Sequence, residues 1–453
     1  MEGTKYTTKE DVLKRAQDAI GIPMKDIDKT GRLATGKGAI GTVLEESWFG
    51  YKPNSEAEPD FPEAGVELKA TPYKKTRSGI SAKERLVCNI INYMTEYKKT
   101  FKTSDFWHKC ETLLIMSYEY KPGVSKGDYT IDKAVLFSYP YEDLIIIEQD
   151  WQKLMEKIKA GKAHLITEGD TLYLAACTKG ASSSDVRQQP FSEIPAKQRA
   201  YSLKSSYMTR VLNSYIFGEQ EDEHIIKDWH VLTKASFEDI IIERLKPNYG
   251  KTVSRLCAYY SLITGAKNVN ELLLSKMLGI HGKASKTNEF QKANIVPKTI
   301  RINKNGTIKE SMSFPTFKFT EIINEEWETS ELKEMLEPVK FMFVIFVEND
   351  LGEYVFERVM FWNMPAQDLE EVHKVWEKTV EVIRSGVKLV YDGRVTRNNF
   401  PKQSENRVAH VRPHGQNSHD TYLLPDGRSM TKQCFWLNRT YVESIIGAKD
   451  EAS

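Results

Sequence analysis

Apolar side chains recur along the first part of the chain at two different spacings, which predicts both helices and strands. The polar stretch Thr7-Thr8-Lys9-Glu10 has the pattern of a capping box, so we expect an amphipathic helix to begin there. The apolar residues that follow it at helical spacing are Val12, Leu13, Ala16 and Ile20. Residues 82–97 and 150–159 are predicted as further helices on the same grounds.

Other segments show the patterns of strands. Residues 113–118 and 134–137 are continuous apolar runs of strand length, which indicates strands covered on both faces. Residues 171–177 alternate and are predicted as another strand. Because the two element types alternate along the chain, the pattern predicts an α/β fold in which helices flank a mixed central sheet.

The stretch 59–69, PDFPEAGVELK, joins a turn to an alternating strand. Side chains alternate faces along a strand, so Glu67 and Lys69 share one face. A proline and a glycine mark a turn that can fold Asp60 back beside them, and a short upstream helix can add Glu45. Two or three carboxylates and a lysine suit a hydrated Mg²⁺ ion and phosphodiester hydrolysis. Taken alone, this motif is also compatible with an ordinary strand that faces solvent.

Several motifs in one order make the pattern specific. The order is I-G-x-x-L-E from Ile40, then P-D-F from Pro59, then A-G-V-E-L-K-A-T-P from Ala64. Further motifs follow at 107–109 (WHK), 150–155 (DWQKLM), 178–181 (TKGA) and 203–204 (LK). Over residues 1–215 the chain resembles the MutH family of GATC endonucleases, a branch of the PD-(D/E)xK nucleases that includes the Sau-type restriction enzymes.

The resemblance implies a role for each residue of the candidate catalytic site. Asp60 and Glu67 would be the principal ligands of Mg²⁺, and Glu45 would orient water or bind a second ion. Lys69 would lie beside the attacking water, and Lys109 would support the scissile phosphate. Hydrolysis would leave a 5′-phosphate and a 3′-hydroxyl.

The resemblance also implies residues that read DNA. A family loop with the pattern R-P-K-G contributes base contacts, and Lys179 and Gly180 match its last two positions. Cys177 stands where the arginine of that loop would be. Tyr201 and Lys204 match a further family segment that faces DNA.

The second half of the chain repeats the first. Glu289-Phe290 follows Asp60-Phe61 at the same offset at which Lys298 follows Lys69, and residues 376–386 echo residues 151–161. An acidic stretch begins at Gly218 and suits a linker. We therefore predict two tandem restriction-endonuclease-like (MutH-like) domains: a catalytic domain at 1–217, a linker at 218–232 and a degenerate DNA-binding or effector domain at 233–453.

The second copy has lost most of the candidate catalytic residues. The residues at the positions of Glu45, Glu67 and Lys109 are Leu274, Val296 and Pro338. Only Glu289 and Lys298 remain, which are too few ligands for the metal. The copy keeps residues that match the DNA-reading loop, namely Arg412, His414 and Gly415, and a basic face is expected from Lys292, Lys298, Arg301 and Lys304.

Composition narrows the partners and the compartment. With 453 residues, 40% hydrophobic and 28% charged, the chain is expected to be globular, and its net charge of +1 means that DNA must be bound by local clusters. Those expected are Lys74, Lys75 and Arg77, and Lys98, Lys99 and Lys102, although each is compatible with a solvated face. Five unpatterned cysteines and no apolar leader or membrane span indicate a cytoplasmic protein with free thiols.

The resemblance implies a type II restriction endonuclease that cuts duplex DNA before the guanine of GATC with Mg²⁺. Two-domain members of the family use their second domain as an effector site, so the resemblance also implies that the second domain here binds another GATC copy as an allosteric effector. We further expect a methyltransferase acting on adenine or cytosine to protect the host, and the free protein to be a monomer that dimerises or loops on DNA. Two alternatives remain open at this stage: a mismatch-repair enzyme that nicks GATC, and a DNA-binding protein without catalysis.

Overall fold

The computed structural model describes residues 6–34, 36, 38–52, 58–76, 79–180, 185–266, 268–308, 311–391, 393 and 396–447. The chain divides into two compact units, Met1–Glu243 with Leu278–Val296, and Arg244–Met277 with Pro297–Ser453. The sequence-based boundaries of the two domains and the linker stay a prediction. Of the residues named in the predicted motifs and clusters, Arg77 and Ala181 lie outside the described residues.

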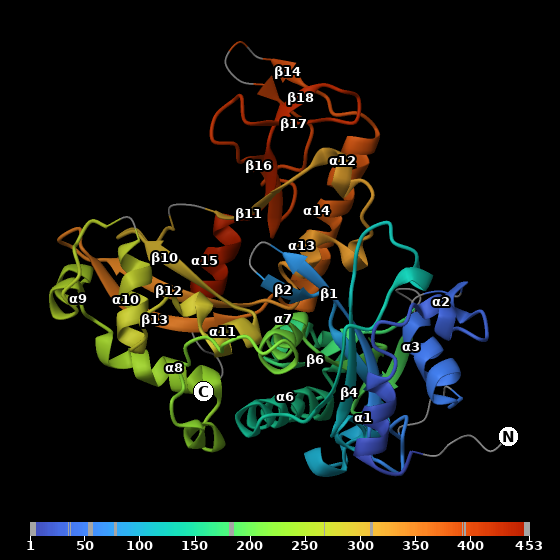
Figure 1. Ribbon diagram of the computed structural model, residues 1–453. Helices are drawn as coiled ribbons and strands as arrows, with labels where there is room; N and C mark the ends of the chain where they lie inside the picture. The colour runs from blue at the N-terminus through green and yellow to red at the C-terminus, as the bar shows by residue number, and fades with distance from the viewer. Residues whose placement is uncertain are drawn as a thin grey trace. The chain divides into compact units, whose positions relative to one another are not determined.

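The first unit contains a four-stranded mixed sheet with the order β2-β1-β4-β5. Its strands are β1 (Glu67–Thr76), β2 (Gly79–Ala82), β4 (Leu113–Glu119) and β5 (Lys133–Phe137). β1 and β4 run parallel, with Glu67 opposite Leu113 (Figure 1). β4 is buried from Leu113 to Ser117, which confirms the predicted strands at 113–118 and 134–137 and the central place of the first.

Helix α1 (Lys9–Gln17) packs against this sheet through Val12 and Ala16, as the helical spacing predicted. Its N-cap is Thr8, whose hydroxyl accepts from the Asp11 amide at 3.1 Å. The predicted capping box was therefore wrong by one residue: Thr8 and Asp11, rather than Thr7 and Glu10, take the two positions.

A second, antiparallel sheet in this unit has the order β3-β9-β6. Its strands are β3 (Leu86–Ile90), β6 (Leu174–Thr178) and β9 (Arg199–Leu203), and α6 (Tyr141–Lys159) packs against β6. The helix predicted at 82–97 was wrong, because Leu86 and Val87 pair with Leu203 and Ser202 of β9 instead. Only a short helix, α4 (Tyr93–Glu96), remains there. The predicted helix at 150–159 is the second half of α6, and the strand predicted at 171–177 begins later, at Leu174, as β6.

The second unit repeats this plan. Its sheets have the orders β10-β12-β13 and β11-β19-β16, and a long helix, α14, lies in the chain position of α6. The elements are β10 (Ile295–Ile302), β11 (Met312–Phe317), β12 (Lys340–Glu348), β13 (Tyr354–Trp362), α14 (Ala366–Arg384), β16 (Ala409–Pro413) and β19 (Gln433–Leu437). The internal duplication is thus visible in topology as well as in sequence.

The remaining elements are short helices and hairpins. The helices are α2 (Met24–Ile27), α3 (Ala39–Val43), α5 (Asp105–Cys110), α7 (Ser205–Arg210), α8 (Phe237–Leu245), α9 (Val253–Tyr259), α10 (Val269–Leu278), α11 (Asn288–Ala293), α12 (Phe319–Ile322), α13 (Glu331–Glu334) and α15 (Arg439–Gly447). The hairpins are β7 (Val186–Gln189) with β8 (Ser192–Lys197), β14 (Val390–Tyr391) with β15 (Thr396–Arg397), and β17 (Thr421–Leu423) with β18 (Ser429–Thr431).

The cysteines of the chain are not bridged to one another. All five are buried free thiols, as predicted from their number and spacing. Within the described ranges, no helix combines the length and apolar character needed to cross a membrane.

Candidate active site

A tight turn brings Asp60 beside the first residue of β1. Phe61 and Val66 pair across the turn through two backbone hydrogen bonds, with N–O distances of 2.9 and 3.2 Å. The Asp60 amide donates to Glu67 Oε2 at 3.1 Å, and Asp60 Oδ2 accepts from the Leu68 amide at 3.0 Å. The turn predicted from the proline and the glycine therefore places two carboxyl groups next to each other.

Two lysines reach the Glu67 carboxylate from different elements. Lys69 lies on the same face of β1 and donates to Glu67 Oε1 at 2.7 Å. Lys109, on α5, lies 3.6 Å from Glu67 Oε2 and donates to the Glu58 carbonyl at 2.9 Å. The Glu67 and Lys109 side chains are only 3% and 9% exposed, so their charges interact with little screening by water.

Glu45 belongs to the helical segment that precedes this turn. Residues Leu44–Phe49 continue α3 as a π-helical turn, an irregularity that is frequent at functional sites. α3 packs against β1. The segment keeps the Glu45 carboxyl close enough to Asp60 and Glu67 for their charges to affect its ionisation.

The pKa values of Glu45, Asp60 and Lys69 lie outside the usual range. Burial, reinforced by the charges of Asp60 and Glu67, raises the pKa of Glu45 to about 8. Burial and the charge of Glu67 raise the pKa of Asp60 to about 6, against the opposing effect of Lys69 and Lys109. Burial disfavours the charged form of Lys69, but the Glu67 carboxylate outweighs it, and the pKa of Lys69 is raised. Near neutral pH, Glu45 therefore keeps its proton, while Lys69 stays charged beside Glu67.

The donor set fits a magnesium ion better than a preformed metal cage. Among the described residues, no group of three or more His, Cys, Asp or Glu side chains is arranged closely enough to enclose a metal. Mg²⁺ does not need such a cage, because it prefers oxygen ligands, retains several waters and is commonly held by one or two carboxylates together with a phosphate. Asp60 and Glu67 can supply those two carboxylates, and Glu45 can contribute a third from a distance.

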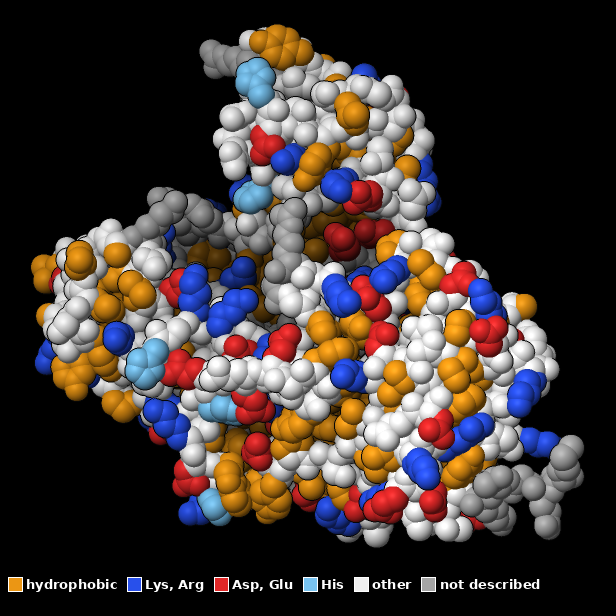
Figure 2. All heavy atoms as spheres, in the orientation of Figure 1, with side chains coloured by type: hydrophobic (Ala, Val, Ile, Leu, Met, Phe, Trp, Pro, Cys, Tyr) orange, Lys and Arg blue, Asp and Glu red, His pale blue; other side chains and the backbone are white. Residues whose placement is uncertain are grey.

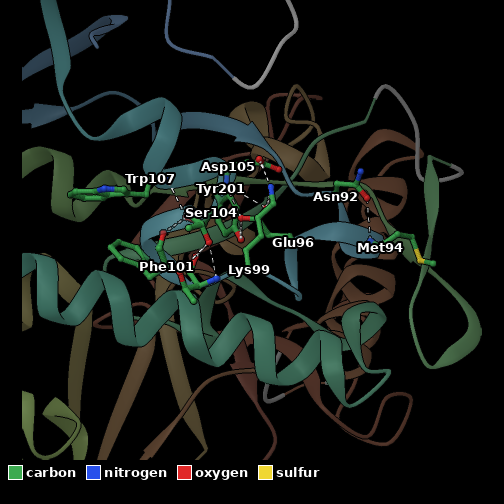
Figure 3. A network of polar contacts seen from close by, with 11 residues as sticks. Asn92, Met94, Glu96, Lys99, Phe101, Ser104, Asp105, Trp107 and Tyr201 are labelled. Atoms are coloured by element: carbon green, nitrogen blue, oxygen red, sulfur yellow. Dashed lines mark hydrogen bonds and ion pairs between the residues drawn. The ribbon is translucent and has the colours of Figure 1, made fainter. Parts of the chain in front are cut away.

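A polar network anchors the helix that carries Lys109 (Figure 3). Ser104 caps α5 by accepting from the Trp107 amide at 3.1 Å, and the Asp105 amide donates to Glu96 Oε1 at 3.1 Å. Lys99 forms ion pairs with both Glu96 and Asp105. Burial, followed by the neighbouring Asp105, raises the pKa of Glu96 to about 7. This network positions α5. No sequence pattern signalled it, because its members come from α4, from the segment between α4 and α5, from α5 and, through Tyr201, from β9.

Tyr201 and Lys204, predicted to contact DNA, lie in the core. Tyr201 is fully buried on β9, and its hydroxyl donates to Glu96 Oε1 at 3.3 Å. Lys204 is 2% exposed and donates to the Thr171 carbonyl at 2.6 Å. In this structure neither side chain reaches the surface, because their polar atoms are used to hold the protein together. The burial of both side chains argues against the predicted DNA contacts of Tyr201 and Lys204.

Lys179 and Gly180 lie at the surface after β6, as the prediction requires. Lys179 is exposed while its amide donates to the Gln198 carbonyl at 2.8 Å, which fixes the backbone of the loop. A β-carbon on Gly180 would lie 2.6 Å from the Asp185 β-carbon, so the close approach favours glycine. Cys177, at the position of the family arginine, is buried.

The corresponding loop of the second unit presents all three predicted residues. The Arg412 guanidinium lies 3.8 Å from the centroid of the Trp436 ring, and the His414 ring meets the same indole edge-on at 5.0 Å. A β-carbon on Gly415 would lie 2.9 Å from the Asp420 carbonyl oxygen, so this position also favours glycine. Arg412 and His414 are exposed. Trp436 was missed by the sequence reasoning because it lies on a separate strand, β19, further along the chain.

The remnants of the motif in the second copy have structural partners. Glu289 accepts from the Ile225 and Ile226 amides at 3.0 and 2.9 Å and contacts His224. Lys292 was predicted to form part of a basic face, but it is buried in an ion pair with Asp143 at 2.8 Å. That prediction was wrong for Lys292, because its ammonium group is paired with a buried carboxylate instead of facing solvent.

The other basic clusters are dispersed rather than continuous. On the face drawn in Figure 2, Lys and Arg side chains are interspersed with Asp and Glu. Lys75 is paired with Glu119 at 2.8 Å, and Lys102 lies 3.8 Å from the Trp107 ring centroid. This agrees with the net charge of +1 and with recognition through local groups.

Comparison with known proteins identifies the class. A family model described as "DNA mismatch repair enzyme MutH" matches residues 49–150 and again 278–374, and the two matches begin at the offset that separates Asp60 from Glu289. The type II restriction enzyme Sau3AI of Staphylococcus aureus is 39% identical over 97% of this chain and 99% of its own length. The MutH proteins of Shewanella woodyi and Escherichia coli (strain SMS-3-5 / SECEC) are 28% and 27% identical, over 40% and 45% of this chain and 79% and 92% of their own lengths.

One solved structure, the complex of restriction endonuclease MvaI with its cognate DNA, matches 45% of this chain and 94% of its own length at 12% identity and a TM-score of 0.21. The clustered carboxyl groups and lysines, the repeated sheet order and the sequence matches together define a site-specific endonuclease that acts on duplex DNA. The chain belongs to the MutH/Sau-type family of restriction endonucleases.

Proposed function

We propose that this protein makes Mg²⁺-dependent double-strand cuts in duplex DNA at GATC, before the guanine, with its single catalytic site in the first domain. The observation that carries the proposal is the cluster in which the Asp60 amide and the Lys69 ammonium both bond the Glu67 carboxylate, at 3.1 and 2.7 Å, with Lys109 at 3.6 Å. The sequence of the second copy keeps too few of these residues to form a counterpart. The sequence GATC itself is inferred from relatives.

We propose a catalytic role for each residue of the cluster from its position. Asp60 and Glu67 would hold the ion, with Glu45 available to orient water or a second ion. When bound, the ion would stabilise negative charge that develops on the phosphate oxygens. Lys69, pointing along the face of β1, would hold the attacking water or the scissile phosphate. Lys109 would support the same phosphate from α5.

We infer a different role for the second domain. It retains the loop with Arg412, His414 and Gly415 but lacks the carboxylates, which favours binding of a second GATC copy as an effector. Cleavage of a two-site substrate should then be faster than cleavage of a one-site substrate, and added GATC duplex should accelerate the latter. Equal rates with no effect of added duplex would refute the effector role.

The biological setting follows from this proposal. A host whose own DNA contains GATC needs a methyltransferase that modifies adenine or cytosine in this sequence and so prevents cleavage. Both proteins would act in the cytoplasm. Because one catalytic site cuts one strand at a time, we propose that the free monomer pairs or loops on DNA to complete the double-strand cut.

The proposal is tested with two plasmid preparations incubated with the protein and magnesium, one unmethylated and one carrying N6-methyladenine at each GATC. Fragments ending at GATC from the unmethylated plasmid are expected. Ends mapped to another sequence would refute the specificity, and no cleavage of either plasmid would refute the proposed activity. Cutting of both would retain the nuclease and the site but show that adenine methylation does not block it.

A mismatch-repair nickase is the second candidate, since the MutH proteins match this chain as well. These relatives align with less than half of the chain, whereas the restriction enzyme aligns with nearly all of it. The two activities differ in product. Accumulation of nicked circles without linear DNA would favour the nickase, and linear products would favour the restriction enzyme.

A further inference from the structure

The two copies of the DNA-reading loop follow strand ladders with the same register. In the first unit β6 and β9 pair antiparallel, with Leu174 opposite Leu203 and Ala175 opposite Ser202. In the second unit β16 and β19 pair in the same way, with Ala409 opposite Leu437 and His410 opposite Trp436. Positions in one ladder therefore correspond to positions in the other.

At two corresponding positions the residues of the two units differ together. Cys177 and Ser202 of the first unit correspond to Arg412 and Trp436 of the second. Where the arginine is present, a tryptophan lies under it, and where the arginine position holds a buried cysteine, the tryptophan position holds a buried serine. The two positions are on neighbouring strands and on one face of the sheet, so their side chains can be in direct contact.

The surroundings of Arg412 show what this tryptophan does. The guanidinium is exposed and lies over the indole face at 3.8 Å, and in the described part of the chain no residue forms an ion pair or a hydrogen bond with it. Other arginines of the same unit are tied to carboxylates, Arg407 to Asp368 and Arg428 to Asp426. A guanidinium stacked on an aromatic ring is held in one plane, while the donors on its edge stay free.

The neighbours of the indole complete the arrangement. His410 and His414 lie on either side of Arg412 along the chain, with ring centroids 6.5 and 5.0 Å from that of Trp436. His410 is buried and hydrogen-bonded to Asn438 at 2.6 Å, which fixes that end of the strand. Gly415 allows the loop to turn closely against the Asp420 carbonyl. β16 lies close to β17 and β18 in Figure 1, all within the second unit.

We propose that Trp436 is a positioning residue that holds Arg412 as a preoriented fork for the edge of a guanine in DNA bound by the second domain. The inference rests on the proposed effector role of that domain and names the base it reads. A planar guanidinium fork matches O6 and N7 of guanine in the major groove. The first domain, with Cys177 and Ser202, lacks this readout and must recognise its site through other groups.

The test uses effector duplexes that differ by one atom. The initial rate of cleavage of a labelled one-site duplex is measured while unlabelled GATC duplex is added, containing either guanine or 7-deazaguanine, which lacks N7. With wild-type protein, the half-maximal concentration of the 7-deazaguanine effector should be about tenfold higher, the loss expected for one base contact. Trp436→Leu should raise the concentration needed of the guanine effector about tenfold and bring the ratio of the two close to one.

Two further variants separate positioning from simple packing. Trp436→Phe keeps an aromatic face and should restore much of the guanine preference, whereas a role in packing alone gives loss of thermal stability without change in the ratio. Arg407→Ala removes an exposed arginine that is paired with Asp368 rather than stacked on a ring, and it should leave the ratio as in wild type. An unchanged ratio in folded Trp436→Leu would overturn the inference.

Failure of the effector role would be seen separately, as a wild-type protein that neither duplex stimulates. In that case the two duplexes are compared by direct binding to the Asp60→Ala protein with and without Trp436→Leu. A guanine preference that disappears with Trp436→Leu would support the positioning role without allostery. A preference that persists, or that is absent from the parent protein, would refute it.

Discussion

The stretches around Asp60 and Glu289 occupy equivalent positions in the two copies, but the groups that surround their acidic side chains differ. In the first copy the chain forms a tight turn that places Asp60 beside Glu67, and Lys69 and Lys109 lie at the Glu67 carboxylate. In the second copy the equivalent Glu289 lies in the first turn of α11, and two backbone amides and a histidine contact its carboxylate. The first copy thus brings carboxyl groups and lysines together at one place, whereas in the second copy the corresponding residue serves as a structural contact.

The largest effect is expected from matched substitutions at the two glutamates. Glu67→Gln removes a charge that the lysines and the metal site require, so single-turnover cleavage should fall by about a thousandfold or more. Glu289→Gln should lower thermal stability, because it weakens a buried hydrogen-bonded group, and leave the single-turnover rate within a few-fold. Quenched-flow cleavage and thermal unfolding of both proteins measure this, and equal losses of rate would break the comparison.

The next effect concerns Lys69, whose ammonium bonds Glu67 at 2.7 Å. Lys69→Met should lower the single-turnover rate about a hundredfold or more, since it removes the positive charge that we propose acts on the reacting phosphate. Lys69→Arg keeps the charge and should recover part of the rate. A Lys69→Met protein that cleaves as fast as wild type would show that the lysine has only a structural role.

A smaller effect should appear in the pH dependence of stability without metal. Because folding raises the pKa of Glu45 to about 8 and of Asp60 to about 6, the unfolded chain releases these protons first, and stability is lost as pH rises from about 4 to 8. Glu45→Gln should therefore unfold about 2–4 °C higher than wild type at pH 8 and at the same temperature at pH 4.

Glu46→Gln is the matched control, because Glu46 is paired with Arg32 at the surface. That pairing lowers the pKa of Glu46, so its replacement should bring no gain at pH 8. Magnesium should stabilise wild type more than Glu45→Gln. The interpretation fails if Glu46→Gln matches Glu45→Gln in melting temperature at pH 8.

The smallest effect is expected at Tyr201. The second copy carries the buried Phe435 at the corresponding position, so Tyr201→Phe makes the first copy more like the second. Losing the hydroxyl bond to Glu96 should cost about 1 kcal/mol of stability and change the dissociation constant for DNA by less than about threefold. A large rise in that constant, without loss of thermal stability, would instead support Tyr201 as a DNA contact.

Local patterns were the reliable part of the sequence. The apolar run at 113–118 predicted β4, and the proline and glycine after Asp60 predicted the turn that forms the site. The duplication could be recognised because matching residues recur at a constant offset along the chain. In each case the physical cause acts over a few residues or repeats along the chain.

Contacts between segments that are distant along the chain could not be predicted from the sequence. Residues 82–97 have apolar spacing compatible with a helix, but pairing of Leu86 with Leu203, in the distant strand β9, makes a strand there. The burial of Tyr201 depends on the same sheet, and the stacking of Arg412 on Trp436 depends on the register of two other strands. Such partners become visible only when the strands are placed side by side.

The presence of one catalytic site, in the first copy, is tested most directly with the Asp60→Ala protein. Binding and cleavage of one unmethylated GATC duplex are measured in the same samples with magnesium. We expect binding to persist within about tenfold of wild type while cleavage of both strands disappears. Continued cleavage of either strand by the folded variant would contradict this, since a second catalytic centre would then have to exist.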